Sequence, residues 1–309
     1  MISQRTLSSK IKITGIGIHS GQRVTMNLHP APHDHGIVFQ RIDIENSPKI
    51  KVNAQNVGAT ENNTAIGSGP GAIHTVEHLL SAFLGLGIDN VFIDIDGLEV
   101  PIMDGSSTSF IFLFMESGLV NLQIPKKFMV IKKKVRVEVG DKWAEINPCD
   151  QLIIHSSISF PHPLIKTQNF HFEFTCQNYI NLISRARTFG FLRDVDYLKR
   201  RGLAKGGSLN NAVVLDDFKV MNEEGLRFTD EFVRHKILDI LGDFSLLGYD
   251  LLGKITTYKS GHNVHNLLCR KILESEENYS IESSAQFKKD QLNWFQLPHF
   301  PMANYINDI

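Results

Sequence analysis

The sequence predicts an α+β fold in which two similar strand-and-helix sandwich domains pack face to face, each with an insertion, with a site at the seam between them. Alternating apolar and polar residues near the start predict antiparallel strands, and the same alternation begins again at Phe128. A short glycine-containing string also recurs after a predicted helix in each half. We therefore expect a first unit over residues 1–126, a second over 127–272 and a polar C-terminal tail over 273–309.

The composition is that of an ordinary globular protein. Of the 309 residues, 42% are hydrophobic, which is enough for a sizeable core. The formal net charge of -1 offers no general attraction for nucleic acid, so we expect no nucleic-acid partner. The sequence has no apolar run typical of a signal peptide or membrane span, and its three cysteines form no Cys-x-x-Cys pair. We expect a cytoplasmic protein without stable membrane insertion.

The first unit begins with strands and continues with helices. Apolar and polar residues alternate over residues 10–28 and 36–44, with Pro30 and Pro32 at the turn between them. A helical pattern follows from His74, where Thr75 is placed to cap the first free amides. Residues 91–96 then form a short strand, and a second helix ends at Ser117.

The second unit repeats this order around an insertion. Strands are expected within 128–146, with a turn at residues 140–141, and at 152–160, 170–174 and 254–258; helices are expected over 175–187, over 229–243 and after His262. The insertion, residues 188–227, has a βαβ-like pattern with a helix over 192–200 and a strand over 212–215. It would form either the wall of a hydrophobic ligand site or an ordinary surface excursion.

A local match between the two halves supports the repeat. Gly87, in the string 84–90, corresponds to Gly248 in the string 247–251. With these glycines aligned, His78 and Asp239 occupy equivalent positions, each nine residues upstream. Two copies of one unit packed face to face would bring both side chains to the seam.

The helix predicted over 229–243 carries two informative polar residues. Its apolar residues recur at helical spacing and should face the core: Val233, Ile237, Ile240, Leu241 and Phe244. His235 and Asp239 lie off this stripe and one turn apart, the spacing at which one helix supplies two ligands to a metal ion. Thr229 is placed to cap the helix. A surface ion pair or a capping arrangement would explain the same His-x-x-x-Asp spacing.

Three further residues complete a candidate catalytic set. A catalytic zinc takes three protein ligands and keeps one position open, and His78 is the best candidate for the third ligand. Glu77 beside it is placed to act as general base. Adjacent Glu-His is a weaker signal than the His-Glu-x-x-His pattern of metallopeptidases. His262 is a candidate acid for a departing amine, although it would equally cap the helix after it, and His265 is an alternative partner.

With these residues in view, the sequence resembles the UDP-3-O-acyl-N-acetylglucosamine deacetylases, the zinc amidases of lipid A biosynthesis in Gram-negative bacteria. The resemblance covers residues 1–272 and rests on several strings long enough to be specific. These strings begin at Gln4, Gly15, Thr75, Gly85, Pro101, Asp141, Ser184, Leu226 and Tyr258. The longest reads Leu-Arg-Phe-Thr-Asp-Glu-Phe-Val-Arg-His-Lys.

The resemblance implies two similar α+β domains with the active site between them, and it implies a role for each candidate. The implied metal ligands are His78, His235 and Asp239, binding zinc or, in the cell, iron(II). Glu77 would be the base and His262 the acid, with Asp243 holding His262 in its orientation. Thr188 would join the metal in stabilising the oxyanion.

The resemblance also implies how a substrate would be held. Lys236, Lys142 and Lys259 would lie near its diphosphate, and Phe160 would stack on uracil. The insertion over residues 189–214, beginning with Phe189, would form a tunnel for a fatty acyl chain. That implication favours the ligand-wall interpretation of the insertion.

Together these expectations predict one reaction. The 2-acetamide of UDP-3-O-acyl-N-acetylglucosamine would be hydrolysed to acetate and the free amine, the committed step of lipid A biosynthesis, by a monomer whose partner is this small-molecule substrate. Two alternatives are a zinc amidase or peptidase for another substrate and a non-catalytic nucleotide-sugar binding protein with a structural metal. Dependence on the acyl chain tests the first alternative, and release of acetate tests the second.

Overall fold

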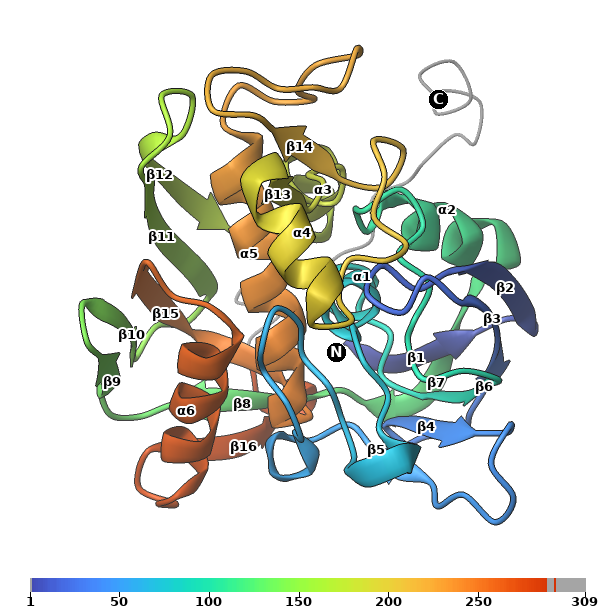
Figure 1. Cartoon of the computed structure of the whole chain (residues 1–309). Helices are drawn as coiled ribbons and strands as arrows, with labels where there is room; N and C mark the ends of the chain where they lie inside the picture. The colour runs from blue at the N-terminus through green and yellow to red at the C-terminus, as the bar shows by residue number, and fades with distance from the viewer. Residues whose placement is uncertain (1, 288–291, 293–309) are drawn as a thin grey trace.

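The first unit is built on a five-stranded sheet (Figure 1). The computed structural model describes residues 2–287 and 292. The strands, in spatial order, are β2 (Ile11–Ile16), β3 (Arg23–Pro30), β6 (Val91–Ile95), β4 (Ile37–Arg41) and β5 (Ile50–Lys51). Neighbouring strands are antiparallel except for the parallel pair β4 and β6. Helix α1 (Glu77–Leu86) precedes β6 in the chain, and α2 (Thr108–Ser117) follows it.

The second unit has the same topology. Its corresponding strands, in spatial order, are β9 (Val135–Val139), β10 (Lys142–Asn147), β15 (Asp250–Tyr258), β11 (Leu152–Phe160) and β12 (Lys166–Glu173). Neighbours are again antiparallel except for one parallel pair, β11 and β15. Helix α5 (Glu231–Phe244) precedes β15, and α6 (His262–Leu273) follows it. The predicted repeat of one α+β unit is therefore confirmed.

Four more strands extend this frame. β1 (Ser3–Leu7) pairs with β7 (Leu119–Pro125), and β8 (Lys127–Ile131) joins the second sheet between β15 and β16 (Tyr279–Ser283). Thus the segment expected to be a polar tail contributes a strand to the sheet. Among the described residues, no helix combines the length and the apolar character that crossing a lipid bilayer requires.

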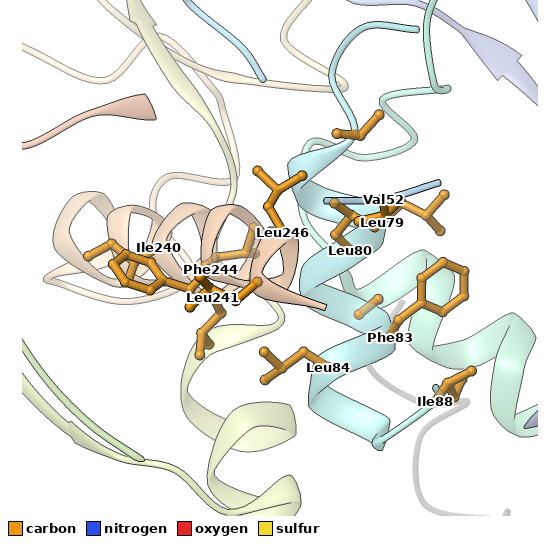
Figure 2. Packing of buried hydrophobic residues seen from close by; sticks show 14 of the residues in the cluster. Val52, Leu79, Leu80, Phe83, Leu84, Ile88, Ile240, Leu241, Phe244 and Leu246 are labelled. Carbon is orange, nitrogen blue, oxygen red and sulfur yellow. The ribbon is translucent and has the colours of Figure 1, made fainter. Parts of the chain in front are cut away.

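Helices α1 and α5 pack against each other in the middle of the molecule (Figures 1 and 2). The predicted apolar stripe of α5 is buried, as expected, and Figure 2 shows its Leu241 and Phe244 near the apolar side chains of α1. His235 and Asp239, predicted to lie off this stripe, are also buried, at 1% and 2% exposure. This burial is inconsistent with the alternative of a surface ion pair and places both residues at the wall of a cavity between the units.

The contact between these helices depends on a glycine. A Cβ atom at Gly242 of α5 would lie 2.0 Å from the carbonyl oxygen of Glu77 at the start of α1, so any side chain there would push the helices apart. The glycines aligned from the sequence are also equivalent. Gly87 follows α1 with φ 64°, and Gly248 follows the short helix η4 (Ser245–Leu247) after α5 with φ 79°, a left-handed conformation that favours glycine.

The predicted caps of α1 and α5 are wrong. α1 begins at Glu77, and Thr75 has a φ of 58° while its hydroxyl donates to Glu99 Oε1 at 2.9 Å. α5 begins at Glu231, so its N-cap residue is Asp230, and Thr229 lies one residue before the cap position. At α1, a tertiary hydrogen bond of Thr75 therefore takes the place of the predicted cap.

The helix predicted over residues 175–187 is shorter and wider than expected. Thr175 caps α3 (Cys176–Asn178), which runs directly into the π-helix η3 (Tyr179–Ile183). The π-helix begins at a tight contact between the Tyr179 ring and Gly85 of α1. A Cβ at Gly85 would lie 2.1 Å from that ring. The remaining short helices are η1 (Ala54–Asn56), η2 (Gly69–Gly71) and η5 (Ser284–Gln286).

The insertion is a βαβ excursion, as its sequence pattern predicts. β13 (Phe189–Phe191) and β14 (Val213–Leu215) are parallel, and α4 (Leu192–Arg200) connects them. Figure 1 shows α4 crossing in front of α5 beside the first unit. Backbone bonds from Lys205 and Gly206 to the carbonyls of His19 and Ile18 tie the insertion to that unit.

Replacing Gly242 with alanine should destabilise the protein. Alanine has the better helix propensity by about 1 kcal/mol, but overpacking against a backbone carbonyl costs about 1–3 kcal/mol and cannot be relieved by a rotamer change. We expect a lower free energy of unfolding in urea. Gly71→Ala is the control, because a Cβ at Gly71 meets nothing within 4 Å. Equal stability of the two variants would contradict the close helix contact.

Candidate active site

Three buried side chains from the two central helices form a cluster suited to a metal ion. His78 is in the first turn of α1, and His235 and Asp239 are one turn apart on α5. Asp239 Oδ1 lies 3.3 Å from His235 Nε2 and 3.7 Å from His78 Nε2. Ligand atoms at the usual zinc distances are roughly 3.3 Å apart in a tetrahedral site, so these separations suit one ion.

The protonation states of the cluster also suit a cation. Burial lowers the pKa of His78 to about 3 and lowers that of His235, so both imidazoles are neutral. Burial would raise the pKa of Asp239, but the positive charge of Lys236, the largest of the opposing effects, helps to lower it and keeps the carboxylate ionised. Metal ligands must be deprotonated in this way.

Neighbouring groups direct the free ligand atoms toward one point. His235 Nδ1–H donates to the Ala186 carbonyl at 3.0 Å, which leaves Nε2 as the ligand atom. Lys236 Nζ donates to Asp239 Oδ2 at 2.8 Å, and the buried Oδ1 has no hydrogen-bond donor among the described residues. An unpaired buried carboxylate oxygen is costly, and a cation would satisfy it.

Glu77 lies at the edge of this cluster with the properties of a base. It is 3% exposed, and burial raises the pKa of its carboxyl to about 8. Its Oε2 accepts a bond from the backbone N–H of Thr64 at 3.0 Å, and its Oε1 is 3.9 Å from His262 Nε2. Glu77 and His262 therefore face each other.

His262 is held by Asp243 and does not cap α6, where Gly261 is the cap residue. His262 Nδ1–H donates to Asp243 Oδ2 at 2.8 Å. Burial lowers the pKa of His262, but the charge and hydrogen bond of Asp243 outweigh burial and raise it to about 9. The imidazole is therefore protonated at neutral pH, as an acid must be.

The alternative residue His265 lies behind this pair. It is 1% exposed; its Nδ1–H donates to the same Asp243 oxygen at 2.6 Å, and its Nε2 accepts from the Ser260 hydroxyl at 2.8 Å. Both ring nitrogens of His265 are thus used, whereas His262 presents Nε2 toward Glu77. The geometry favours His262 over His265 as the proton donor.

A single cavity of about 830 Å³ joins these groups to the predicted substrate contacts. All the residues predicted for the site line it except Asp243, which lies behind His262. The predicted substrate and oxyanion residues on its walls are Lys142, Phe160, Thr188, Phe189, Lys236 and Lys259. The sequence interpretation therefore selected side chains that the fold brings together.

Two of the lysines are engaged by carboxylates of the protein. Lys236 Nζ pairs with Asp239 and lies 5.5 Å from the centre of the Phe189 ring, and Lys259 Nζ pairs with Asp141 at 2.7 Å. Phe160 packs edge-on against Phe189, with 5.6 Å between ring centres. The aromatic wall continues into the insertion.

Thr64 is the main contributor that the sequence interpretation missed. It falls in the polar loop over residues 61–71, to which no role was given. Its partners are Glu77, 13 residues away, and Asp243, 179 residues away. No local pattern reveals contacts at such separations, because they exist only after the two units pack.

Comparisons with known proteins identify the family to which this chain belongs. The model of the LpxC family, described as UDP-3-O-acyl N-acetylglycosamine deacetylase, matches residues 4–274. A protein named UDP-3-O-acyl-N-acetylglucosamine deacetylase from Thioalkalivibrio sulfidiphilus is 48% identical to this chain, over 90% of this chain and 92% of its own length. A protein of the same name from Actinobacillus succinogenes is 49% identical, over 91% of this chain and 93% of its own length. The similarly named Haemophilus influenzae protein is 47% identical over 91% of this chain and 93% of its own. The chain therefore belongs to the UDP-3-O-acyl-N-acetylglucosamine deacetylase family.

Proposed function

We propose that this protein hydrolyses the 2-acetamide of UDP-3-O-acyl-N-acetylglucosamine to acetate and the free amine, the committed step of lipid A biosynthesis. The observation that carries the proposal is the meeting of a three-ligand cluster with the Glu77–His262 pair in one cavity. Membership of the deacetylase family supplies the substrate class. We expect the enzyme to act in the cytoplasm as a monomer.

His78, His235 and Asp239 would hold the metal ion, which we take to be zinc, with iron(II) as the alternative in the cell. Two neutral imidazoles and one carboxylate are a ligand set typical of catalytic zinc. A bound ion would activate water and polarise the acetyl carbonyl. Its charge would also lower the pKa of Glu77 from about 8 toward neutrality, so that the carboxylate is available as a base.

Glu77 and His262 would move the protons of the reaction. Glu77 takes a proton from water as the water oxygen bonds to the acetyl carbon. His262 then gives its Nε2 proton to the amide nitrogen as the C–N bond breaks, and the products are acetate and the amine. Asp243 keeps His262 charged and oriented through the 2.8 Å bond.

The other cavity residues would bind the substrate and the developing charge. Thr188, at the entrance to β13, is placed to donate to the oxyanion. Lys142, Lys236 and Lys259 supply positive charge for the diphosphate, and Phe160 offers a ring face for uracil. These are the roles that the resemblance to the deacetylase family implies, and the position of each residue on the cavity wall supports them.

The insertion would hold the fatty acyl chain. Most of the larger side chains that it contributes to the cavity lining are apolar: Phe189, Phe191, Val195, Leu198, Ala212 and Val214. Behind them a second apolar cluster packs Val213 and Leu215 against Phe232 and Val233 of α5. An acyl chain buried there would gain about 0.8 kcal/mol for each CH₂ group removed from water.

Removing a metal ligand should abolish tight metal binding. After chelation and dialysis, the unmodified protein should take up one equivalent of zinc, measured by calorimetry, whereas His235→Ala and Asp239→Ala should bind it at least about a hundredfold more weakly. His171→Ala, at an exposed histidine, is the control. If both ligand variants bound zinc with the affinity of the unmodified protein, the metal site would not be this cluster. A separate measurement, metal analysis of anaerobically purified protein, distinguishes zinc from iron(II).

The roles of His262 as acid and Glu77 as base should be distinguishable by the pH dependence of kcat. Because His262 acts in its protonated form, kcat should fall as the pH rises past its pKa of about 9. Glu77→Gln and His262→Gln should each reduce kcat roughly 10²–10⁴-fold, and only His262→Gln should lose the alkaline limb. The exposed His33→Gln is the control. Near-normal turnover by folded, metal-loaded Glu77 or His262 variants would refute the assigned roles.

The acyl chain should be needed for efficient turnover. The unacylated UDP-sugar should have a kcat/KM at least about tenfold lower than the 3-O-acylated substrate, since remote binding energy assists the reaction. Leu198→Asp, which places a charge in the cavity wall, should reduce this preference, whereas Tyr197→Asp on the exposed side of α4 should not. Equal kcat/KM values for both substrates in the unmodified enzyme would favour an amidase for another substrate.

A further inference from the structure

Thr64 uses all three of its hydrogen-bonding groups inside the seam, where it is 1% exposed. Its N–H donates to Glu77 Oε2 at 3.0 Å, and its hydroxyl donates to Asp243 Oδ1 at 2.6 Å. Its carbonyl accepts from the N–H of Val76, the cap residue of α1, at 3.2 Å. One residue thus contacts the proposed base and the carboxylate that orients the proposed acid.

The direction of the hydroxyl bond follows from chemistry. Asp243 is ionised, because its histidine partners outweigh the effect of burial and lower its pKa, so both of its oxygens can only accept. Oδ2 already accepts from His262 and His265. Thr64 is the donor on Oδ1 and so opposes rotation of the carboxylate about its broad terminal torsion.

This bond crosses the boundary between the two units. Thr64 and Glu77 belong to the first unit, and Asp243 and His262 belong to the second. The loop around Thr64 is itself braced, since Ala65 N–H donates to the Ala59 carbonyl and Gly58 N–H donates to the Ala65 carbonyl, both at 2.9 Å. A braced residue can hold two partners at a constant separation.

We propose that Thr64 is a positioning residue for the amide hydrolysis, which fixes the Asp243–His262 pair relative to Glu77. This inference rests on the proposed function, because it concerns the same base and acid. Thr64 would touch neither the substrate nor the reacting atoms. Its effect would pass through the carboxylates that it contacts, and the geometry of proton transfer would depend on its hydroxyl.

The test compares Thr64→Val, which keeps the shape and removes the hydroxyl, with Thr64→Ser, which keeps the hydroxyl. Using metal-loaded full-length protein and the 3-O-acylated substrate, we expect Thr64→Val to lower kcat roughly 10–100-fold with KM changed less than about twofold. Thr64→Ser should remain within about threefold of the unmodified enzyme. Metal content should stay at one equivalent in both. Should Thr64→Val fail to fold, Thr64→Ala takes its place in every comparison.

A double-mutant cycle tests whether Thr64 acts through Asp243. In an Asp243→Asn background, Thr64→Val should lower kcat by no more than about a further twofold, because the partner of the hydroxyl has already been altered. The proposal is overturned if Thr64→Val turns over normally, if Thr64→Ser is equally impaired, or if the two losses multiply fully. Activity in the Glu77 and His262 variants would instead refute the proposed function, so the two failures are distinguishable.

Discussion

The site depends on one close backbone contact, where α5 crosses the start of α1 with only a hydrogen atom at Gly242 facing the Glu77 carbonyl. Packing at this distance sets His78 within 3.7 Å of Asp239 although the two residues come from different units. Because interiors are close-packed, a small increase in helix separation would spread the ligand cluster and the acid–base pair together. The apolar side chains seen between the helices in Figure 2 hold that contact in place.

The same packing concentrates charge that neither unit could bury alone. At the junction of the units, Lys126 Nζ lies 2.5 Å from Asp89 Oδ1 and 2.7 Å from Asp250 Oδ2. These aspartates are equivalent in the repeat, each two residues after the aligned glycine. At this junction, and again at the candidate active site, carboxylates from both units are buried close together beside groups of opposite charge. Such an arrangement requires the two units to pack in one register.

Much of the fold was predictable because it follows hydrophobic periodicity. The strand over 152–160 and the helix over 192–200 have the predicted bounds, and the βαβ form of the insertion is confirmed. The errors include the starts of α1 and α5, the segment 175–187 and the expected tail, which contributes β16 to the second sheet. Thr75 illustrates this: its hydroxyl donates to Glu99 rather than accepting from the free amides of α1, so a local capping rule places the helix one residue early.

The sequence by itself determined the repeat, the apolar faces and the residue types available for chemistry, since these depend on spacing along one chain. The tertiary structure alone decided which polar residues meet: it buried His235 and Asp239 under the first unit and placed Thr64 between Glu77 and Asp243. It also distinguished His262 from His265: both Nδ1–H groups donate to Asp243 Oδ2, but Nε2 of His265 accepts from Ser260 whereas Nε2 of His262 faces Glu77. The physical reason is that hydrogen bonds and desolvation act through space, and a bond spanning 179 residues leaves no periodic trace in the sequence.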